Sequence, residues 1–500
     1  MTHTLGQEGA LEPYGAPRSV AVVGGGLALW LAALAMSQRL PESVVIHVVE
    51  TRADPRDDWL YGTLLPPEIY GFHLEMGVAE PDFMQETETV FAFGTTFLDW
   101  ADTNRSWVSA FHAPLPVISG VPLSKLVAAQ DASQETVELQ DCLISAVAAR
   151  RGVFAHPPEA GHSPLSKAEY GYLADPSDLA RYYRSRCWNR VHYVSGRMGS
   201  VEREGDRVMA LEMADSTRIA ADVWIDASGL EAHLAGPSHT IAPKIALAFA
   251  DIAGRPGPPS CLVQSDNSGW SLSTPLRTRA LRLSVGPPGS GTRGSLEFAP
   301  AIHPAPWTVN VVAIGVAAAR FAPLTGAAMR LLLRDVQRLR DLFPVSGDSR
   351  IEAREYNAAH ASAASQAYHY HLAHFADVAL PPGPCWTDAA AQAAPDTRPP
   401  ALQRKLRQYT ERGYLVDYDH EPFDADSWAI LHAGIGRRPR RSDALASAVP
   451  KSEAAAQLRQ LAGGVRDTAQ KMPPHPLYLA KFLDYLRRRA GTPLREVANG

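Results

Sequence analysis

The sequence predicts an α/β fold built around a parallel β-sheet, and three segments carry this prediction. Residues 20–23 form a β-branched run that meets three glycines at residues 24–26, and an Ala/Leu-rich helical stretch then leads to a second β-branched run at residues 44–49. Strand, helix and strand in this order form one βαβ unit. Short apolar runs at residues 221–227 and 311–316, each followed by small residues, indicate two further buried strands.

The glycine turn of the first unit predicts a dinucleotide site. Gly24 and Gly26 allow a tight turn that lets a pyrophosphate approach backbone N–H groups, and the helix N-terminus adds partial positive charge. Glu50, which closes the second strand, would accept hydrogen bonds from ribose hydroxyls. Leu29 stands where the G-x-G-x-x-G pattern has its third glycine. An ordinary βαβ crossover that binds nothing is therefore the alternative.

Length and composition limit the class of protein. The chain has 500 residues, which predicts one large domain or two closely joined domains. With a net charge of −5 and no long charged run, it lacks the signature of a nucleic-acid or membrane partner, and the basic patch at residues 437–441 is expected to be a solvated loop. The apolar stretch at residues 27–36 is too short to span a bilayer. Four cysteines without metal-type spacing favour a reducing cytoplasm.

The positions of these signals predict the domain organisation. Residues 1–17 are polar and are expected to form a disordered tail rather than a signal peptide. Residues 18–350 are expected to form an FAD-binding module, because interruption of a nucleotide-binding sheet by inserted substrate regions, here at about residues 60–195 and 245–305, is typical of flavoproteins. Residues 351–490 are expected to be mostly helical and to lie on the substrate side.

Local patterns add detail to this organisation. Turn residues between alternating segments predict hairpins within residues 196–220, and a helix is expected from about residue 327 to residue 342. Residues 452–472 and 477–489 have apolar positions at helical spacing. The Pro/Ala-rich stretch at residues 381–400 is expected to be a mobile loop.

Short stretches along most of the chain match the motifs of one family in order. They are residues 22–26 with Trp30, 62–67, 97–100 with His112, 120–123, 173–183, 225–229, 354–357, 368–370 and 427–436. Together they resemble the flavin-dependent tryptophan halogenase family from about residue 19 to residue 477. Residues 62–67 are similar to its flavin-strap motif, normally G-E-x-[TS]-x-P, and residues 225–229 to its I-D-C-S-G segment.

The resemblance implies a Rossmann-like FAD/NAD(P)-binding module of the flavin monooxygenase/halogenase type, with inserted β elements and a mostly helical C-terminal region. It implies that a separate flavin reductase supplies reduced FAD, that O2 gives a flavin hydroperoxide, and that hypohalous acid then reaches an essential lysine. The substrate would be an electron-rich ring, typically indole, either free or attached to a carrier or peptide. The positions expected to contact the cofactor are Gly24, Gly26, Ala28, Glu50, Thr63, Leu64, Asp226, Gly229, Gly315, Phe321 and Pro323.

The residues at the family's catalytic positions are different in this chain. Ala92 stands at the lysine position and Thr325 at the glutamate position, while Thr63 replaces the strap glutamate. Leu272 replaces the second tryptophan of the W-x-W-x-I-P motif, which is thought to exclude monooxygenation. Alanine has no amine to hold hypohalous acid, and threonine is not a carboxylate at neutral pH. His112 is the candidate substrate-lining residue that the resemblance retains.

Three functions therefore stay open. The first is a non-halogenating flavin-dependent oxidoreductase or monooxygenase that acts on an indole- or tryptophan-like substrate with reduced flavin and O2. The second is a halogenase with relocated catalytic groups, such as Lys125 or Lys167. The third is a degenerate member that binds a partner without catalysis. No metal is expected, because His371 and His374 lack supporting carboxylate or cysteine ligands. The oligomeric state stays open, with a homodimer among the expectations.

Overall fold

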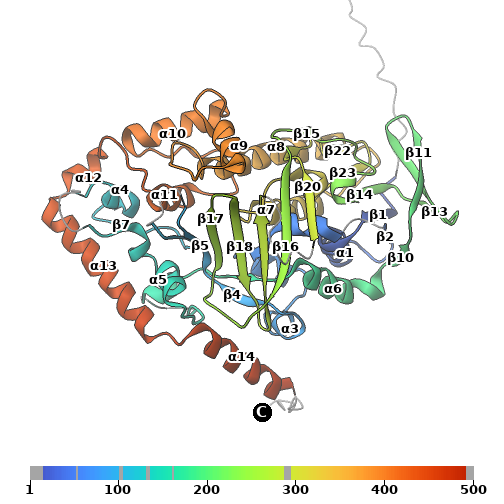
Figure 1. Cartoon of the computed structure of the whole chain (residues 1–500). Coiled ribbons are helices and arrows are strands. Elements are labelled where there is room, and N and C mark those ends of the chain that lie inside the picture. Colours follow the sequence, from blue (N-terminus) through green and yellow to red (C-terminus); the bar gives the residue numbers. More distant parts are fainter. Residues whose placement is uncertain are drawn as a thin grey trace, which may run out of the picture.

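The computed structural model describes residues 15–51, 55–100, 105–130, 136–159, 161, 163–286 and 294–490. Most of the expected N-terminal tail, residues 1–14, lies outside the described residues. Two large sheets and a set of C-terminal helices form the molecule (Figure 1). The antiparallel sheet lies at the centre of Figure 1, the parallel sheet to its right and helices α10 to α13 to its left.

The first sheet is the parallel sheet that the sequence predicts. Its six strands lie in the order β10, β2, β1, β14, β23 and β22, and all neighbouring pairs are parallel except β23 with β22. Their bounds are β1 Ser19–Gly24, β2 Val45–Glu50, β10 His192–Ser195, β14 Val223–Ala227, β22 Trp307–Thr308 and β23 Val311–Ala313. Helix α1 (Gly26–Arg39) is apolar over residues 27–36 because it is buried against the sheet and against helices α6 (Pro176–Cys187) and α7 (Ala327–Asp341). The predicted α/β fold class is confirmed.

The second large sheet comes from the inserted segments. It has the order β20, β16, β19, β18, β17, β5 and β6, and only the β17–β5 pair is parallel. The bounds are β5 Gly94–Leu98, β6 Trp107–Ala110, β16 Ile245–Ala253, β17 Cys261–Asp266, β18 Gly269–Pro275, β19 Arg279–Val285 and β20 Gly294–Phe298. The smaller strands are β3 Leu64–Leu65, β4 Val90–Ala92, β7 Val117–Ile118, β8 Val121–Pro122, β9 Gly171–Leu173, β11 Met198–Glu204, β12 Arg207–Met213, β13 Arg218–Ala220, β15 His239–Thr240, β21 Ala301–Ile302 and β24 Ala319–Arg320. Strands β11 to β13 form the predicted hairpins.

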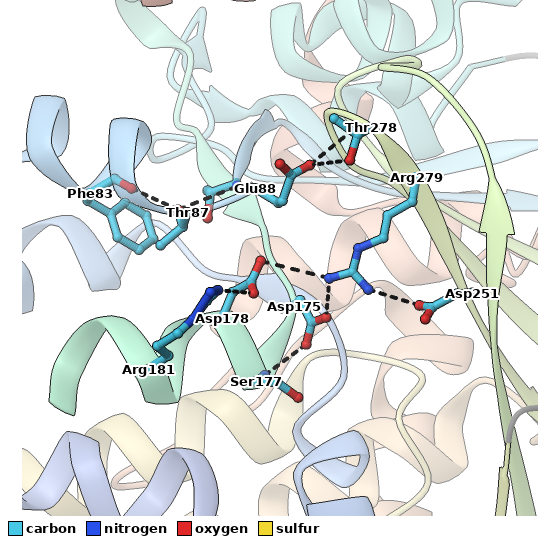
Figure 2. A network of polar contacts seen from close by, with 11 residues as sticks. Phe83, Thr87, Glu88, Asp175, Ser177, Asp178, Arg181, Asp251, Thr278 and Arg279 are labelled. Atoms are coloured by element: carbon cyan, nitrogen blue, oxygen red, sulfur yellow. Dashed lines mark hydrogen bonds and ion pairs between the residues drawn. The ribbon is translucent and has the colours of Figure 1, made fainter. Parts of the chain in front are cut away.

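An ion-pair network joins the two sheet systems (Figure 2). Arg279 on β19 contacts the carboxylates of Asp175 at 2.6 Å, Asp251 at 2.9 Å and Asp178 at 3.8 Å. Asp175 is the N-cap of α6 and accepts the Ser177 N–H at 2.8 Å. The network therefore fixes the start of α6 against strands β16 and β19 of the antiparallel sheet.

The C-terminal region is mostly helical. Its helices are α8 Arg350–Ala373, α9 Pro384–Ala393, α10 Pro400–Arg412, α11 Ala425–Gly434, α12 Ala444–Ala448, α13 Lys451–Lys471 and α14 His475–Ala490. The remaining short helices are α2 Glu68–Glu75, α3 Glu80–Glu86, α4 Leu123–Ala128 and α5 Ile144–Arg151. In the described part of the chain, every helix is either too short or too polar to cross a bilayer.

The expectation of a mobile loop at residues 381–400 is wrong. This segment contains α9, and Trp386 on that helix is only 1% exposed. Its ring lies 5.3 Å from that of Trp100 and 5.5 Å from that of Trp270. Burial of this indole among other aromatic rings stabilises the helix, an outcome that the Pro/Ala-rich composition conceals.

Candidate functional site

Three glycine turns meet at one edge of the parallel sheet. Gly26 follows β1, Gly229 follows β14 in the short helix η5 (Gly229–Glu231), and Gly315 follows β23 in the short helix η6 (Gly315–Ala317). Their φ angles are 63°, 67° and 57°, in the left-handed region that favours glycine. Neighbouring parallel strands place their carboxyl ends together, so these turns form one cradle of backbone N–H groups. We call it the glycine cradle.

The short helix η1 (Pro55–Tyr61) lies in this cradle. Each turn donates one backbone N–H to a side chain of η1: Leu27 to Asp58 at 2.9 and 3.1 Å, Leu230 to Asp57 at 2.7 Å, and Val316 to the Tyr61 hydroxyl at 3.1 Å. The glycines permit this approach. A Cβ would lie 2.3 Å from an Asp58 oxygen at Gly26, 2.1 Å from an Asp57 oxygen at Gly229, and 2.2 Å from the Tyr61 oxygen at Gly315.

In this conformation the cradle does not fit a dinucleotide. The backbone donors that a pyrophosphate would use are already bound to oxygen atoms of η1. The turn after β1 keeps Gly24 and Gly26, the first two glycines of the dinucleotide-binding pattern. The misfit therefore lies in η1 and not in the sheet.

The buried acid Asp58 has a strongly perturbed pKa. Burial raises the pKa of Asp58 to about 8, the N–H of Leu27 opposes this change, and the charges of Asp57 and Asp175 add to it. In β24, burial lowers the pKa of Arg320, while the charge of Asp57 acts in the opposite direction. Protonation of Asp58 limits the negative charge inside the cradle.

Glu50, the expected ribose ligand, already has protein partners. Its carboxylate accepts the Tyr193 hydroxyl at 2.5 Å and the indole N–H of Trp30 at 3.3 Å. The guanidinium of Arg184 lies 3.6 Å from the same carboxylate and stacks over the rings of Trp30, Trp188 and Tyr193. The adenosine end of the expected site is thus lined by rings and by one ion pair.

Three other expected cofactor residues, Asp226, Ala28 and Gly24, are occupied by the protein's own packing or hydrogen bonds. Asp226 is fully buried at the end of β14, and its carboxylate accepts the N–H groups of Ser228, Leu234 and Ala235 at 2.7 to 3.0 Å. It therefore holds the loop that carries Gly229. Ala28 lies in the buried first turn of α1, and the backbone carbonyl of Gly24 accepts both hydrogen bonds of Thr51.

The expected residues of the strap and of the Pro loop contact strand β18, helix α8 and one another. Thr63 is buried and its hydroxyl lies 2.6 Å from that of Thr274 on β18. Phe321 stacks on Tyr368, with ring centroids 5.6 Å apart. Pro323 packs beside Gly62, and Leu64 lines the cavity described next.

A cavity of about 260 Å³ lies between strands β5 and β6 and helices α7, α8 and α11. We call it the aromatic cavity. Its aromatic lining residues are Phe97, Phe111, His112, Tyr370, His374 and Phe423. The charged lining residues are Glu68, Glu169, Arg330, Arg334, Glu421 and Asp424.

The two arginines that line the aromatic cavity already have partners in the protein. Arg330 pairs with Glu68, and Arg334 donates to the backbone carbonyl of His420 at 2.8 Å. Burial raises the pKa of Glu169, with the charge of His112 opposing and that of Glu68 adding to this effect. The cavity is therefore suited to an aromatic ring with a hydrogen-bond donor or a positive charge.

A hydroxyl and a carboxylate lie close to the imidazole of His112 in the cavity. The Nε2 atom of His112 lies 3.4 Å from the Ser427 hydroxyl and 3.8 Å from Asp424. Burial alone raises the pKa of Asp424, but hydrogen bonds from Ser427 and the charges of His112 and Arg330 bring it below its ordinary value.

Of the two residues at the family's catalytic positions, one lines the aromatic cavity and the other does not. Thr325 lines the aromatic cavity, whereas Ala92 is fully buried in β4 opposite Gly171 on β9. Among the described residues that line the cavity there is no lysine. Lys125 pairs with Asp443 at 2.8 Å, and Lys167 is not a lining residue. Within the described chain, no three His, Cys, Asp or Glu residues are arranged to hold a metal.

No motif in the sequence marks the residues that fill the glycine cradle. Asp57, Asp58 and Tyr61 directly precede the Gly62–Pro67 strap motif. Two adjacent acids in front of that motif were the available signal, but acidic pairs are common on exposed loops. Glu169 of the aromatic cavity had no motif around it.

Comparison with known proteins identifies the family. The sequence model of the tryptophan halogenase family matches residues 19–286 and 291–451. BrvH, a flavin-dependent halogenase from Brevundimonas sp. BAL3, is 25% identical with a TM-score of 0.84, over 93% of this chain and 99% of BrvH. Tryptophan 6-halogenase SttH of Streptomyces toxytricini is 21% identical over 513 residues, which are 90% of this chain and 96% of SttH.

A third relative agrees with these two. The 7-chloro-L-tryptophan 6-halogenase KtzR of Kutzneria sp. is 21% identical over 519 residues, covering 92% of this chain and 99% of KtzR. The family model covers most of the chain, in two segments separated by a short gap. The chain therefore belongs to the flavin-dependent tryptophan halogenase family, whose enzymes use FAD that a separate flavin reductase reduces.

Proposed function

We propose that this protein is a non-halogenating flavin-dependent oxidoreductase that acts on an indole-like aromatic substrate with reduced FAD and O2. The observation that carries the proposal is the lining of the aromatic cavity, which combines aromatic rings and carboxylates but includes no lysine among its described residues. Ala92 at the family's lysine position and Thr325 at its glutamate position support the same conclusion. Neither side chain can hold hypohalous acid or act as a carboxylate.

The cavity residues of this chain bind and orient the substrate in this proposal. The rings of Phe97, Phe111 and Tyr370 offer apolar contact to an aromatic substrate. Glu169 and Asp424 are acceptors for an indole N–H or a substrate ammonium group. His112 lies 3.8 Å from Asp424, and its charge acts to lower the pKa of both carboxyls.

The experiment is a product analysis with purified protein, FAD, a flavin reductase and either chloride or bromide. The substrate panel contains tryptophan, indole and a tryptophan-containing peptide. We expect products that gain oxygen and carry no halogen, measured by mass spectrometry. A product whose mass follows the halide would refute the proposal and favour relocated halogenation groups. The control variant Asp141→Asn changes an exposed ion pair with Arg150 and is expected to leave product formation unchanged.

A second candidate function is a non-catalytic family member that binds a partner. The filled glycine cradle favours this candidate, because η1 occupies the donors that FAD would need. The two candidates differ in flavin binding. A protein that binds no flavin even at high FAD concentration supports the non-catalytic candidate. Bound flavin together with an oxygenated product supports the enzyme.

A further inference from the structure

One short segment satisfies donors at three turns that are far apart in the sequence. The turns follow β1, β14 and β23, and η1 provides an acceptor to each of them through Asp58, Asp57 and Tyr61. A pyrophosphate in a glycine cradle is held by the same kind of bond, from backbone N–H to an anionic or polar oxygen. The side chains of η1 thus present the acceptor chemistry of the ligand that this backbone is shaped to bind.

The segment is also fixed on the side away from the cradle. Trp59 stacks on Phe249 of β16 with ring centroids 4.7 Å apart and an interplanar angle of 19°. Arg56 donates to the backbone carbonyl of Ser295 on β20 at 2.8 Å. These contacts hold η1 between the two sheets, so its position in the cradle does not depend on one hydrogen bond.

Steric contact makes the arrangement exclusive. The polar atoms of η1 lie 2.1 to 2.3 Å from where a Cβ would project at Gly26, Gly229 and Gly315. No atom of a ligand can enter that space while η1 is present. A ligand that used the same three N–H groups would therefore have to replace η1.

We propose that residues 55–61 are an internal competitor of FAD, and that FAD binds only after η1 has left the glycine cradle. The inference rests on the proposed function in taking FAD as the ligand. It goes beyond that function because it assigns a regulatory role to a segment with no catalytic group. Flavin affinity is then set by the balance between docked and released η1.

The competition makes a quantitative prediction. The apparent affinity for FAD is the intrinsic affinity multiplied by the fraction of molecules with η1 released. A substitution that weakens docking of η1 raises the released fraction by some factor. The apparent affinity for FAD rises by that same factor, as long as most molecules still have η1 docked. Loss of one buried hydrogen bond changes such a balance by up to about tenfold.

The test is a titration of oxidised FAD, followed by quenching of its fluorescence. We expect Asp58→Ala to bind FAD about tenfold more tightly than the natural chain. Tyr61→Phe, a smaller change that removes only the hydroxyl, is expected to act in the same direction. The matched control is Asp222→Ala, because Asp222 accepts the N–H groups of Arg18 and Ser19 at 2.7 and 3.0 Å at the opposite end of β1.

Hydrogen exchange gives a second readout that does not depend on turnover. Addition of FAD is expected to increase exchange in peptides covering residues 55–61. If FAD binds without this increase, and Asp58→Ala binds no more tightly, the competition is refuted while the flavoenzyme proposal stands. If neither chain binds FAD although circular dichroism shows folded protein, both proposals fail. If the variants bind tightly but no oxygenated product forms, only the proposed function fails.

Discussion

The ion pair between Lys405 and Glu421 allows a sharp prediction about stability. The side chains of Lys405 on α10 and of Glu421 are 1% and 6% exposed. Glu421 also accepts the indole N–H of Trp428 at 2.8 Å, and the Lys405 ammonium lies 4.3 Å from the centroid of that ring. Burial lowers the pKa of Lys405, and the partner Glu421 opposes this change. The pair is therefore a desolvated charge pair whose carboxylate has two additional donors, the Trp428 indole and the Tyr418 N–H at 3.2 Å.

The perturbation is Lys405→Met, which keeps most of the apolar volume and removes the ammonium. Loss of one partner of a buried pair costs about 3–5 kcal/mol because the other charge stays buried without compensation. Trp428 still donates to Glu421, so we expect a loss near the lower end, about 3 kcal/mol, in urea unfolding followed by circular dichroism. The double variant Lys405→Met/Glu421→Gln is expected to recover most of this loss. An unchanged single variant, or a double variant as unstable as the single, would refute the reasoning.

Three further predictions concern the cradle and the cavity. The unfolding free energy should fall as pH rises from about 4 to about 8, because the folded protein holds the Asp58 proton with a pKa of about 8 against an ordinary value of 3.8, and Asp58→Asn should flatten this part of the urea-unfolding profile. Gly315→Ala should lower the unfolding free energy by about 2 kcal/mol, since its φ is 57° and its Cβ would lie 2.2 Å from the Tyr61 oxygen. Adding Tyr61→Phe should recover part of that loss, and strictly additive effects would contradict the contact. His112→Ala should weaken indole binding about fivefold in calorimetry and leave FAD binding unchanged, whereas equal loss of both would indicate unfolding.

The parallel sheet and its glycine turns could be predicted because their signals are local. The run from Val20 to Gly26 specifies strand, turn and helix within a few positions, and Glu50 follows at the spacing of one helix and one strand. The helices at residues 451–471 and 475–490 are likewise indicated by apolar residues at helical spacing. These elements need no knowledge of distant partners.

The content of the cradle could not be predicted in this way. Asp57 and Asp58 are ordinary acidic residues until the fold brings them to Leu230 and Leu27, 173 and 31 positions away. Asp226 matched a cofactor motif, yet its carboxylate is satisfied by its own loop. Hydrogen-bond partners of this kind depend on tertiary packing, which no local pattern encodes.

A competitor carried on the same chain has a further consequence for how the protein is handled. Its effective concentration at the cradle is fixed by the tether, so neither dilution nor dialysis removes it. Occupancy by FAD then depends on the free flavin concentration and not on the protein concentration. Protein purified without added flavin is expected to be colourless even if it is competent, and loading with excess FAD must come before any spectrum is used to judge whether this chain is an enzyme.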